Sequence, residues 1–101
     1  MNDYAMIGSF ETKPENRETL VEILLKAAEM MNELDDCQMY IVNKDAEDAG
    51  RVWVYEMWTS KAAHDNSLTL LQVRELISQA MPLLVGQPEG TSLIPMGGKG
   101  L

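Results

Sequence analysis

The sequence predicts an α+β protein with the ferredoxin-like order βαββαβ, and three observations support this prediction. Its 101 residues form one domain with a packed core, since 46% of them are hydrophobic. Two segments show the three- and four-residue spacing of apolar residues that is typical of amphipathic helices. Four shorter segments, most of them rich in Val, Ile or aromatic residues, take the places that the split βαβ plan gives to strands.

The first two elements are a strand over residues 4–12 and a helix within residues 12–34. The strand segment reads YAMIGSFET, with aromatic residues near both ends. Thr12 and Glu15 have the spacing of a helix capping box, and Pro14 is tolerated in a first turn. The helix then carries glutamates on its outer faces and an apolar stripe formed by Leu20, Leu24, Ala27, Met31 and Leu34.

The sequence of residues 37–59 predicts an antiparallel hairpin. Residues 37–45 (CQMYIVNKD) and 51–59 (RVWVYEMWT) both have the composition of strands. Because the polar connection between them is short, antiparallel pairing is the simplest arrangement.

The last third of the chain begins with a short segment, SKAAHD, for which Ser60 is the expected helix cap. A second long helix is expected over residues 70–84, which Pro82 should kink or end. Its predicted apolar side consists of Leu71, Val73, Leu76, Ile77, Ala80, Met81 and Leu84. A loop at GQPEG and a last strand at TSLIPM complete a domain over residues 1–96, and residues 97–101 form a mobile tail.

A sheet of this plan carries both helices on one face and leaves the other face without cover. Residues along the strand 51–59 alternate between the two faces. One face receives Val52, Val54, Glu56 and Trp58, and the other receives Arg51, Trp53, Tyr55 and Met57. Neither set is purely polar, so both faces should be covered. A second copy of the chain is the economical cover for the open face, and we predict a homodimer.

The charge of the chain disfavours several classes of partner. Sixteen Asp and Glu against eight Lys and Arg give a formal net charge of −8. Nucleic acid is therefore not expected, because phosphate binding needs clustered cations, and an anionic membrane surface is disfavoured for the same reason. No segment approaches the roughly 20 apolar residues of a membrane span. The N-terminus has no basic segment followed by a long apolar run, so we expect a soluble, cytoplasmic protein.

The chain has one cysteine and one histidine, which limits its chemistry. Cys37 cannot form an internal disulfide. Cys37 and His64 alone cannot supply the usual nitrogen and sulfur ligands of a structural metal site, so no metal is expected. The two could act together as nucleophile and base only if the fold brought them into contact, and the spacing does not show this.

Residues 52–70 hold both tryptophans and the only histidine. Glu56 stands between apolar neighbours on its strand face, where an isolated buried charge is costly. It either pairs with a Lys, an Arg or backbone donors near the dimer contact, or it belongs to the polar lining of a pocket. His64 lies about one turn into the segment that Ser60 caps. It could accept a proton near neutral pH, or it could be a surface or core-edge residue.

Several residues near this segment are candidates for binding a ligand: Tyr40, Trp53, Tyr55, Trp58 and Asn66. The aromatic residues could line a pocket for a flat molecule, since rings stack and their polar tips orient a guest. The alternative is that they are ordinary core residues. Asn66 could hydrogen-bond the ligand, or it is a turn residue. The residues by themselves indicate a small apolar pocket with Tyr, Trp and one His nearby.

The segment YEMWTSKAAHDNSL, continued by TLLQVRELISQAMPLL and ended by PMGGKGL, resembles the antibiotic biosynthesis monooxygenase domain family. Within that family it is most similar to small bacterial members described as candidate quinol monooxygenases. The resemblance covers nearly the whole chain, including the opening strand and the KPENRETLVEILL helix. Its most specific part is Glu-x-Trp followed by a Ser-capped Ala-His. The resemblance implies a dimeric α/β barrel, which agrees with the predicted homodimer.

For characterised relatives the resemblance also implies oxygenation of phenolic or quinol-like aromatics by molecular oxygen, without metal, flavin or haem. Triplet oxygen reacts poorly with closed-shell molecules, whereas a deprotonated hydroxyaromatic can pass it one electron. The protein then needs an apolar pocket, a group that removes or shares the phenolic proton, and donors for the reduced oxygen. By this resemblance His64 assists proton transfer, and Tyr55 or Tyr40 hydrogen-bonds the substrate. Trp53 and Trp58 shape the pocket, although strand parity separates Tyr55 from Trp58.

A second branch of the same superfamily degrades haem with an Asn on the first strand, a Trp, and a His far along the second helix. The segments YAMIGSF and LLQVRELISQAM have neither the Asn nor the His, so haem degradation is disfavoured. The leading hypothesis is a cofactor-independent monooxygenase that acts on a small hydroxyaromatic or quinol. The alternative is a non-catalytic ligand-binding or stress-response protein, because one fold hosts both kinds of function.

Overall fold

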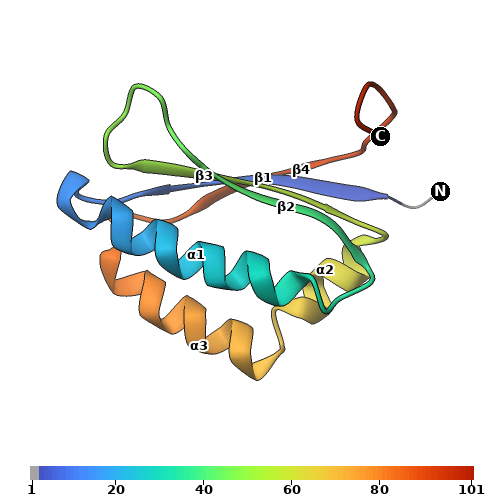
Figure 1. The fold of residues 1–101 in the computed structure, drawn as a ribbon, viewed down its shortest axis with the longest axis horizontal. Coiled ribbons are helices and arrows are strands. Elements are labelled where there is room, and N and C mark those ends of the chain that lie inside the picture. Colours follow the sequence, from blue (N-terminus) through green and yellow to red (C-terminus); the bar gives the residue numbers. More distant parts are fainter. Residues whose placement is uncertain (1–2) are drawn as a thin grey trace.

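The computed structural model describes residues 3–101 as a four-stranded antiparallel sheet with its helices on one face (Figure 1). The strands are β1 (Tyr4–Glu11), β2 (Cys37–Lys44), β3 (Arg51–Trp58) and β4 (Glu89–Leu93). The helices are α1 (Arg17–Met31), α2 (Lys61–Ser67) and α3 (Leu71–Ala80), with short 3-10 turns at Pro14–Asn16 and Met81–Leu83. The strand order β2-β3-β1-β4 is that of the ferredoxin-like fold, so the predicted α+β class and βαββαβ plan are confirmed.

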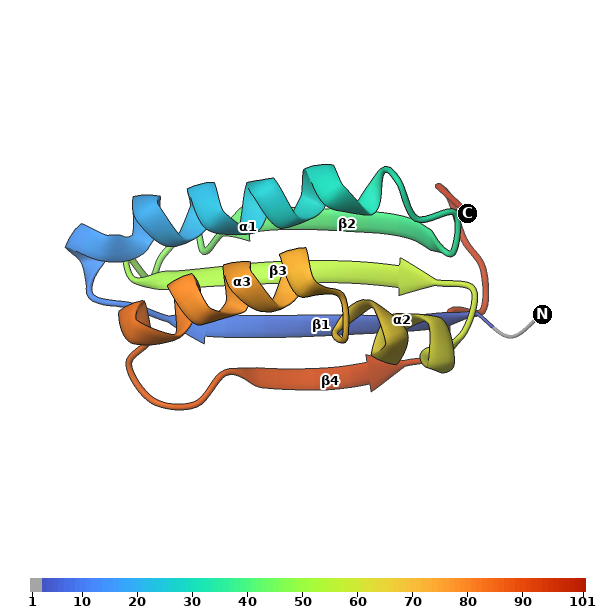
Figure 2. The same ribbon diagram turned by 90° about the horizontal axis from the view of Figure 1, so that it is seen from below.

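The helices form a single layer under the sheet. Figure 2 shows α1 running along β2, α3 beneath the centre of the sheet, and α2 at the end where β1 begins and β3 ends. Within residues 3–101, no helix lies on the opposite face of the sheet (Figure 1). Across the described chain, no helix combines the length and the apolarity that crossing a bilayer would require.

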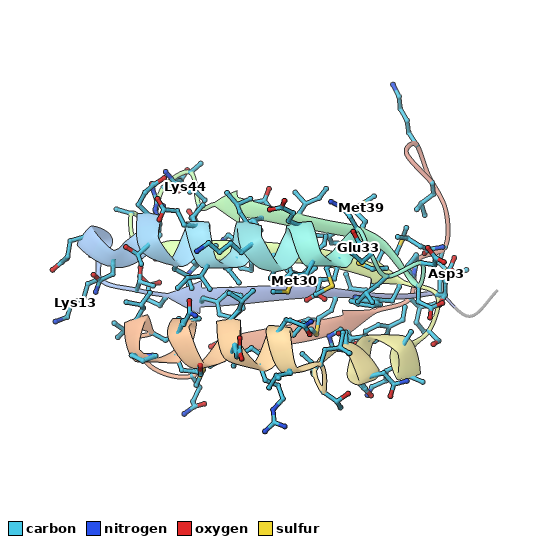
Figure 3. All side chains as sticks on the ribbon, turned by 60° about the horizontal axis from the view of Figure 1, so that its bottom comes forward. Asp3, Lys13, Met30, Glu33, Met39 and Lys44 are labelled. Carbon is cyan, nitrogen blue, oxygen red and sulfur yellow. The ribbon has the colours of Figure 1, made fainter. Side chains whose placement is uncertain are left out.

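The core lies between the sheet and the two longer helices. It contains Leu20, Ile23, Leu24 and Ala27 from α1, Val52 and Val54 from β3, and Leu76 and Ala80 from α3. Four of the five residues predicted as the apolar stripe of the first helix are buried, and the fifth, Leu34, is half-buried beyond the end of α1. Figure 3 shows the charged residues Lys13 and Lys44 at one end of the molecule and Asp3 at the other. Met30, in the same view, lies on the side of α1 that faces α3.

The register of the strands confirms the predicted alternation along β3. Trp58 pairs with Tyr4 and Glu56 pairs with Met6, and these residues face the helices. The alternate position Trp53 faces away from the helices and is 37% exposed, whereas Trp58 is 1% exposed. β2 and β3 pair antiparallel from Lys44 opposite Val52 to Cys37 opposite Trp58, as the hairpin prediction requires, with one shift of register between Cys37 and Met39.

The predicted capping box at the start of the first helix is wrong. Thr12 is buried, and its backbone N–H and its Oγ1 both donate to the carbonyl oxygen of Gly50, at 2.8 and 2.9 Å. A hydroxyl bound in this way is not available to cap a helix. The chain instead enters α1 through the 3-10 turn, whose N-cap residue Lys13 makes no side-chain cap hydrogen bond.

The predictions for the last third of the chain are partly corrected. Ser60 caps α2 as expected, since its Oγ accepts a hydrogen bond from the N–H of Ala63 at 3.0 Å. Pro82 lies in the 3-10 turn that ends the second long helix. Three residues assigned to the apolar side of that helix are exposed in the single chain: Leu71, Ile77 and Met81.

The last strand begins and ends earlier than predicted, at Glu89–Leu93 rather than at residues 91–96. Leu93 pairs with Ala5 near the start of β1, and Pro95 has no N–H with which to extend the ladder. Ile94 and Met96 are therefore exposed beyond the strand. The predicted domain limits of residues 1–96 and the mobility of the tail stay predictions, and residues 1 and 2 lie outside the described range.

Gly50, in the turn between β2 and β3, is held directly against the chain that leaves β1. A Cβ at this position would lie 2.1 Å from the carbonyl oxygen of Thr12 and 2.6 Å from Oε2 of Glu11. The chain around Thr12 and the turn around Gly50 cannot move apart to make room for a Cβ without breaking the two hydrogen bonds from Thr12 to Gly50. Gly50→Ala should therefore lower the free energy of unfolding by about 1–3 kcal/mol, measured by urea denaturation. Gly8→Ala is the control, because its Cβ would have no neighbour nearer than 3.6 Å; equal losses would contradict this explanation.

Candidate active site

A cavity of about 200 Å³ lies between the sheet and the two longer helices. Most of its walls are apolar side chains: Met6, Phe10, Ile23, Leu24, Ala27, Met31, Leu68, Val73, Leu76, Ile77 and Ala80. An apolar cavity of about 150 Å³ is large enough for benzene. The volume therefore suits one aromatic ring with small substituents.

The polar groups of the cavity come from three elements and converge on one region. Tyr40 comes from β2, Glu56 from β3, and His64 with Ser67 from α2. Ser60 begins α2 directly after β3, so His64 falls one turn into the helix and is directed back under the sheet. The hydroxyl of Ser67 donates to the carbonyl oxygen of His64 at 2.6 Å, which fixes this turn of backbone.

Glu56 is the buried carboxyl of the cavity. Its Oε1 accepts a hydrogen bond from Nε1 of Trp58 at 3.0 Å, and Nε2 of His64 lies 3.8 Å from the same oxygen. Burial raises the pKa of Glu56, against the opposing effects of the Trp58 hydrogen bond and of His64. Among the described residues no Lys or Arg forms an ion pair with it. Of the two sequence-based interpretations, the geometry thus supports a polar group of a pocket rather than a Lys or Arg pair.

His64 is 5% exposed, so it is not a surface residue. Its ring centroid lies 5.4 Å from that of Tyr4 and 5.7 Å from that of Trp58, with the Trp ring edge-on. Its Nδ1 lies 3.0 Å from Oδ1 of Asp65. The imidazole is therefore held by two aromatic rings and lies between two carboxyl groups.

Tyr40 contributes a phenol to the cavity wall. Burial, and then the charge of Glu56, raise the pKa of its hydroxyl well above the usual range. The hydroxyl therefore keeps its proton at neutral pH and is able to donate a hydrogen bond to a ligand.

The remaining aromatic candidates do not share this cavity. Trp58 lies beneath it and contacts it through Glu56 and His64. Trp53 and Tyr55 lie on the opposite face of the sheet, where Nε1 of Trp53 donates to Oδ2 of Asp45 at 2.7 Å. Strand alternation makes this placement unavoidable once Glu56 faces the helices. Any role of Trp53 or Tyr55 in binding a substrate therefore stays a prediction that this cavity does not support.

Asn66 also lies outside the cavity. It is exposed and lines a smaller depression of about 150 Å³ together with Leu34, Trp58 and Ala63. Residues that are two positions apart in a helix project from nearly opposite sides of it, so the side chain of Asn66 points away from the cavity that His64 lines. Its proposed contact with a ligand stays untested.

Cys37 is not placed to act as a nucleophile in the cavity. Burial, followed by the charge of Glu56, raises the pKa of its thiol to about 11, so little thiolate is present at neutral pH. Its Sγ donates to the carbonyl oxygen of Met39 at 3.6 Å. Within residues 3–101 no group of three or more His, Cys, Asp or Glu is arranged to hold a metal ion.

Comparison with known proteins places the chain in one protein family. The family model described as antibiotic biosynthesis monooxygenase matches residues 3–78. A solved structure from Chloroflexus aurantiacus J-10-fl, named as a candidate antibiotic biosynthesis monooxygenase, is 32% identical, with 98% of each chain covered and a TM-score of 0.86. Rv0793 from Mycobacterium tuberculosis is 22% identical, with a TM-score of 0.86 over 97% of this chain and 99% of that chain, which shows the shared fold. No curated protein matches the chain at a significant level.

Proposed function

The chain belongs to the antibiotic biosynthesis monooxygenase family, and we propose that it oxidises a small hydroxyaromatic or quinol with molecular oxygen. The observation that carries this proposal is the contact between His64 and Glu56 at the wall of an apolar cavity sized for one aromatic ring. A base in an apolar pocket is what the activation of a phenol requires.

The reaction balances without a further reductant. A C–H and an O–H bond of the hydroxyaromatic break, and one oxygen atom forms a new C=O bond on the ring. The O–O bond breaks, and the second oxygen atom leaves as water with both hydrogen atoms. The substrate supplies all four electrons, so the product is a quinone and no external electron donor is consumed.

The residues of the cavity would divide the proton transfers between them. The pair His64 and Glu56 takes the hydroxyl proton, so that the phenolate can pass an electron to oxygen, and later returns a proton to the departing oxygen. The hydroxyl of Tyr40 donates a hydrogen bond to an oxygen atom of the substrate. The apolar walls exclude water, which strengthens these interactions.

Oxygen uptake with a panel of quinols and naphthols tests the proposal. We expect uptake above the autoxidation rate without added metal or flavin, and a loss of about 10²- to 10⁴-fold in His64→Ala. Asn66→Ala is the matched control from the same helix and should keep the wild-type rate. If the protein consumes no compound of the panel faster than that compound autoxidises, the proposed monooxygenase activity is disproved. Thermal stabilisation by a quinol without turnover would instead favour the non-catalytic ligand-binding alternative.

We also propose that two copies pair through the open face of the sheet. This face exposes Ile7, Ile41 and Trp53, which a monomer would leave in water. Analytical ultracentrifugation should give a dimer at micromolar concentration, and Trp53→Glu should shift it toward monomer because the charge would be buried. A wild-type monomer under these conditions would disprove the pairing.

A further inference from the structure

The imidazole of His64 lies between a carboxyl inside the cavity, Glu56, and a carboxylate outside it, Asp65. We infer that Asp65 is a positioning residue that holds a proton on Nδ1 of His64, and so leaves Nε2 as the proton acceptor facing Glu56 and the cavity. The inference deepens the proposed function and rests on it, because it specifies which nitrogen receives the proton of the substrate.

The contact on the outer side has the geometry of a hydrogen bond. Nδ1 of His64 lies 3.0 Å from Oδ1 of Asp65, and the other oxygen of Asp65 accepts from Nζ of Lys61 at 2.9 Å. The Lys61 hydrogen bond, and then the His64 contact, lower the pKa of Asp65. Asp65 is therefore an acceptor-only carboxylate at neutral pH, so the hydrogen atom between it and the ring must belong to Nδ1.

The contact on the inner side shows what this tautomer achieves. A neutral imidazole carries one proton, so a proton on Nδ1 leaves a lone pair on Nε2, which lies 3.8 Å from Oε1 of Glu56. A proton from a bound hydroxyl can then reach Nε2 directly or through Glu56. The ring that accepts this proton lies between the carboxyl groups of Glu56 and Asp65.

The other titratable groups around the ring do not replace Asp65 in this role. The ring of Tyr4 from β1 lies tilted at 48° to the imidazole, and its hydroxyl hydrogen-bonds Ser92. Tyr40 and Cys37 from β2 keep their protons because burial raises the pKa of each. The cavity residues of α1 and α3 are all apolar. Asp65 is the partner of Nδ1, and Lys61 acts on the ring only through Asp65.

The test uses the fact that His64 is the only histidine in the chain. Nitrogen-15 NMR of the labelled protein, recorded over a pH series, reports directly which ring nitrogen of the neutral imidazole carries the proton. We expect Nδ1–H in the wild type and a shift toward Nε2–H in Asp65→Ala, with kcat lowered about 10-fold in that variant. Lys61→Met is the matched control, because it removes the ion pair to Asp65 but keeps the carboxylate; it should keep Nδ1–H.

The outcomes separate this inference from the proposed oxidation. Nε2–H in the wild type, an unchanged tautomer in Asp65→Ala, or the same shift in Lys61→Met as in Asp65→Ala would overturn the role of Asp65, whatever the activity. An Asp65-dependent tautomer in a protein that consumes no quinol would support the positioning of His64 while the proposed oxidation fails.

Discussion

Glu56→Gln should lower the rate of quinol oxidation about 10²- to 10⁴-fold and, at neutral pH, raise the stability of the folded protein. Gln has the same shape, and its Oε1 can still accept the hydrogen bond that Nε1 of Trp58 donates to Glu56. The amide cannot take up a proton, so the partner of His64 in proton transfer is lost while the packing is kept. Oxygen uptake and thermal denaturation of the same preparation measure both effects.

The gain in stability follows from the sign of the pKa shift. Burial raises the pKa of Glu56 in the folded protein above its value in the unfolded chain. Between these two values the folded state holds a proton that the unfolded state has lost, so the free energy of unfolding falls as the pH rises through this interval. The Gln variant lacks this dependence. Its advantage over the wild type should therefore be absent in acid, below the ordinary pKa of a glutamate, and grow as the pH rises through the interval between the two pKa values.

Glu22→Gln is the matched control for this pair of effects. Glu22 is exposed on α1, away from the cavity, so its replacement should change neither the rate nor the pH dependence of unfolding. A Glu56→Gln variant that is less stable than the wild type at neutral pH would contradict our account. It would show that the carboxylate of Glu56 stabilises the folded protein, whereas we expect its burial beside the cavity to destabilise it.

The sequence was sufficient to predict features that depend on local periodicity. The spacing of Leu20, Leu24 and Ala27 predicts the buried side of α1, and alternation along β3 predicts that Glu56 and Trp58 share the face opposite Trp53. Both rules follow from backbone geometry alone. The βαββαβ order then fixes which face the helices cover.

Features that depend on contacts between distant segments could not be predicted in this way. The motif of Thr12 and Glu15 fits a capping box, but a hydrogen bond to Gly50, 38 residues away, decides the position of Thr12. The contact of Glu56 with His64 depends on the angle at which α2 leaves β3, which no periodicity encodes. Residue type alone groups Trp53 and Tyr55 with the pocket, although alternation separates them from it.

Trp58→Ala should lower the free energy of unfolding by about 3–5 kcal/mol, a larger loss than Gly50→Ala should cause. Trp58 is fully buried in a cluster with Met31 and Val73, and its removal leaves both a cavity and the carboxyl of Glu56 without its indole donor. Trp58→Phe would keep most of the packing and lose only the donor, so it should cost about 1–3 kcal/mol. Urea denaturation followed by circular dichroism measures both, since the substitutions change the fluorescence.

Trp53→Ala tests whether the loss in the free energy of unfolding depends on the burial of a tryptophan or only on the residue type. Trp53 lies on the same strand, but it is 37% exposed on the other face and its Nε1 bonds the exposed Asp45. Its loss should cost the single chain only about 1 kcal/mol. Because pairing through that face would add a concentration-dependent contribution, all variants are compared at one protein concentration and again at a tenfold dilution. Equal losses for Trp53→Ala and Trp58→Ala in dilute protein would contradict the placement of Trp58 beneath the cavity, and with it the hydrogen bond on which the orientation of Glu56 depends.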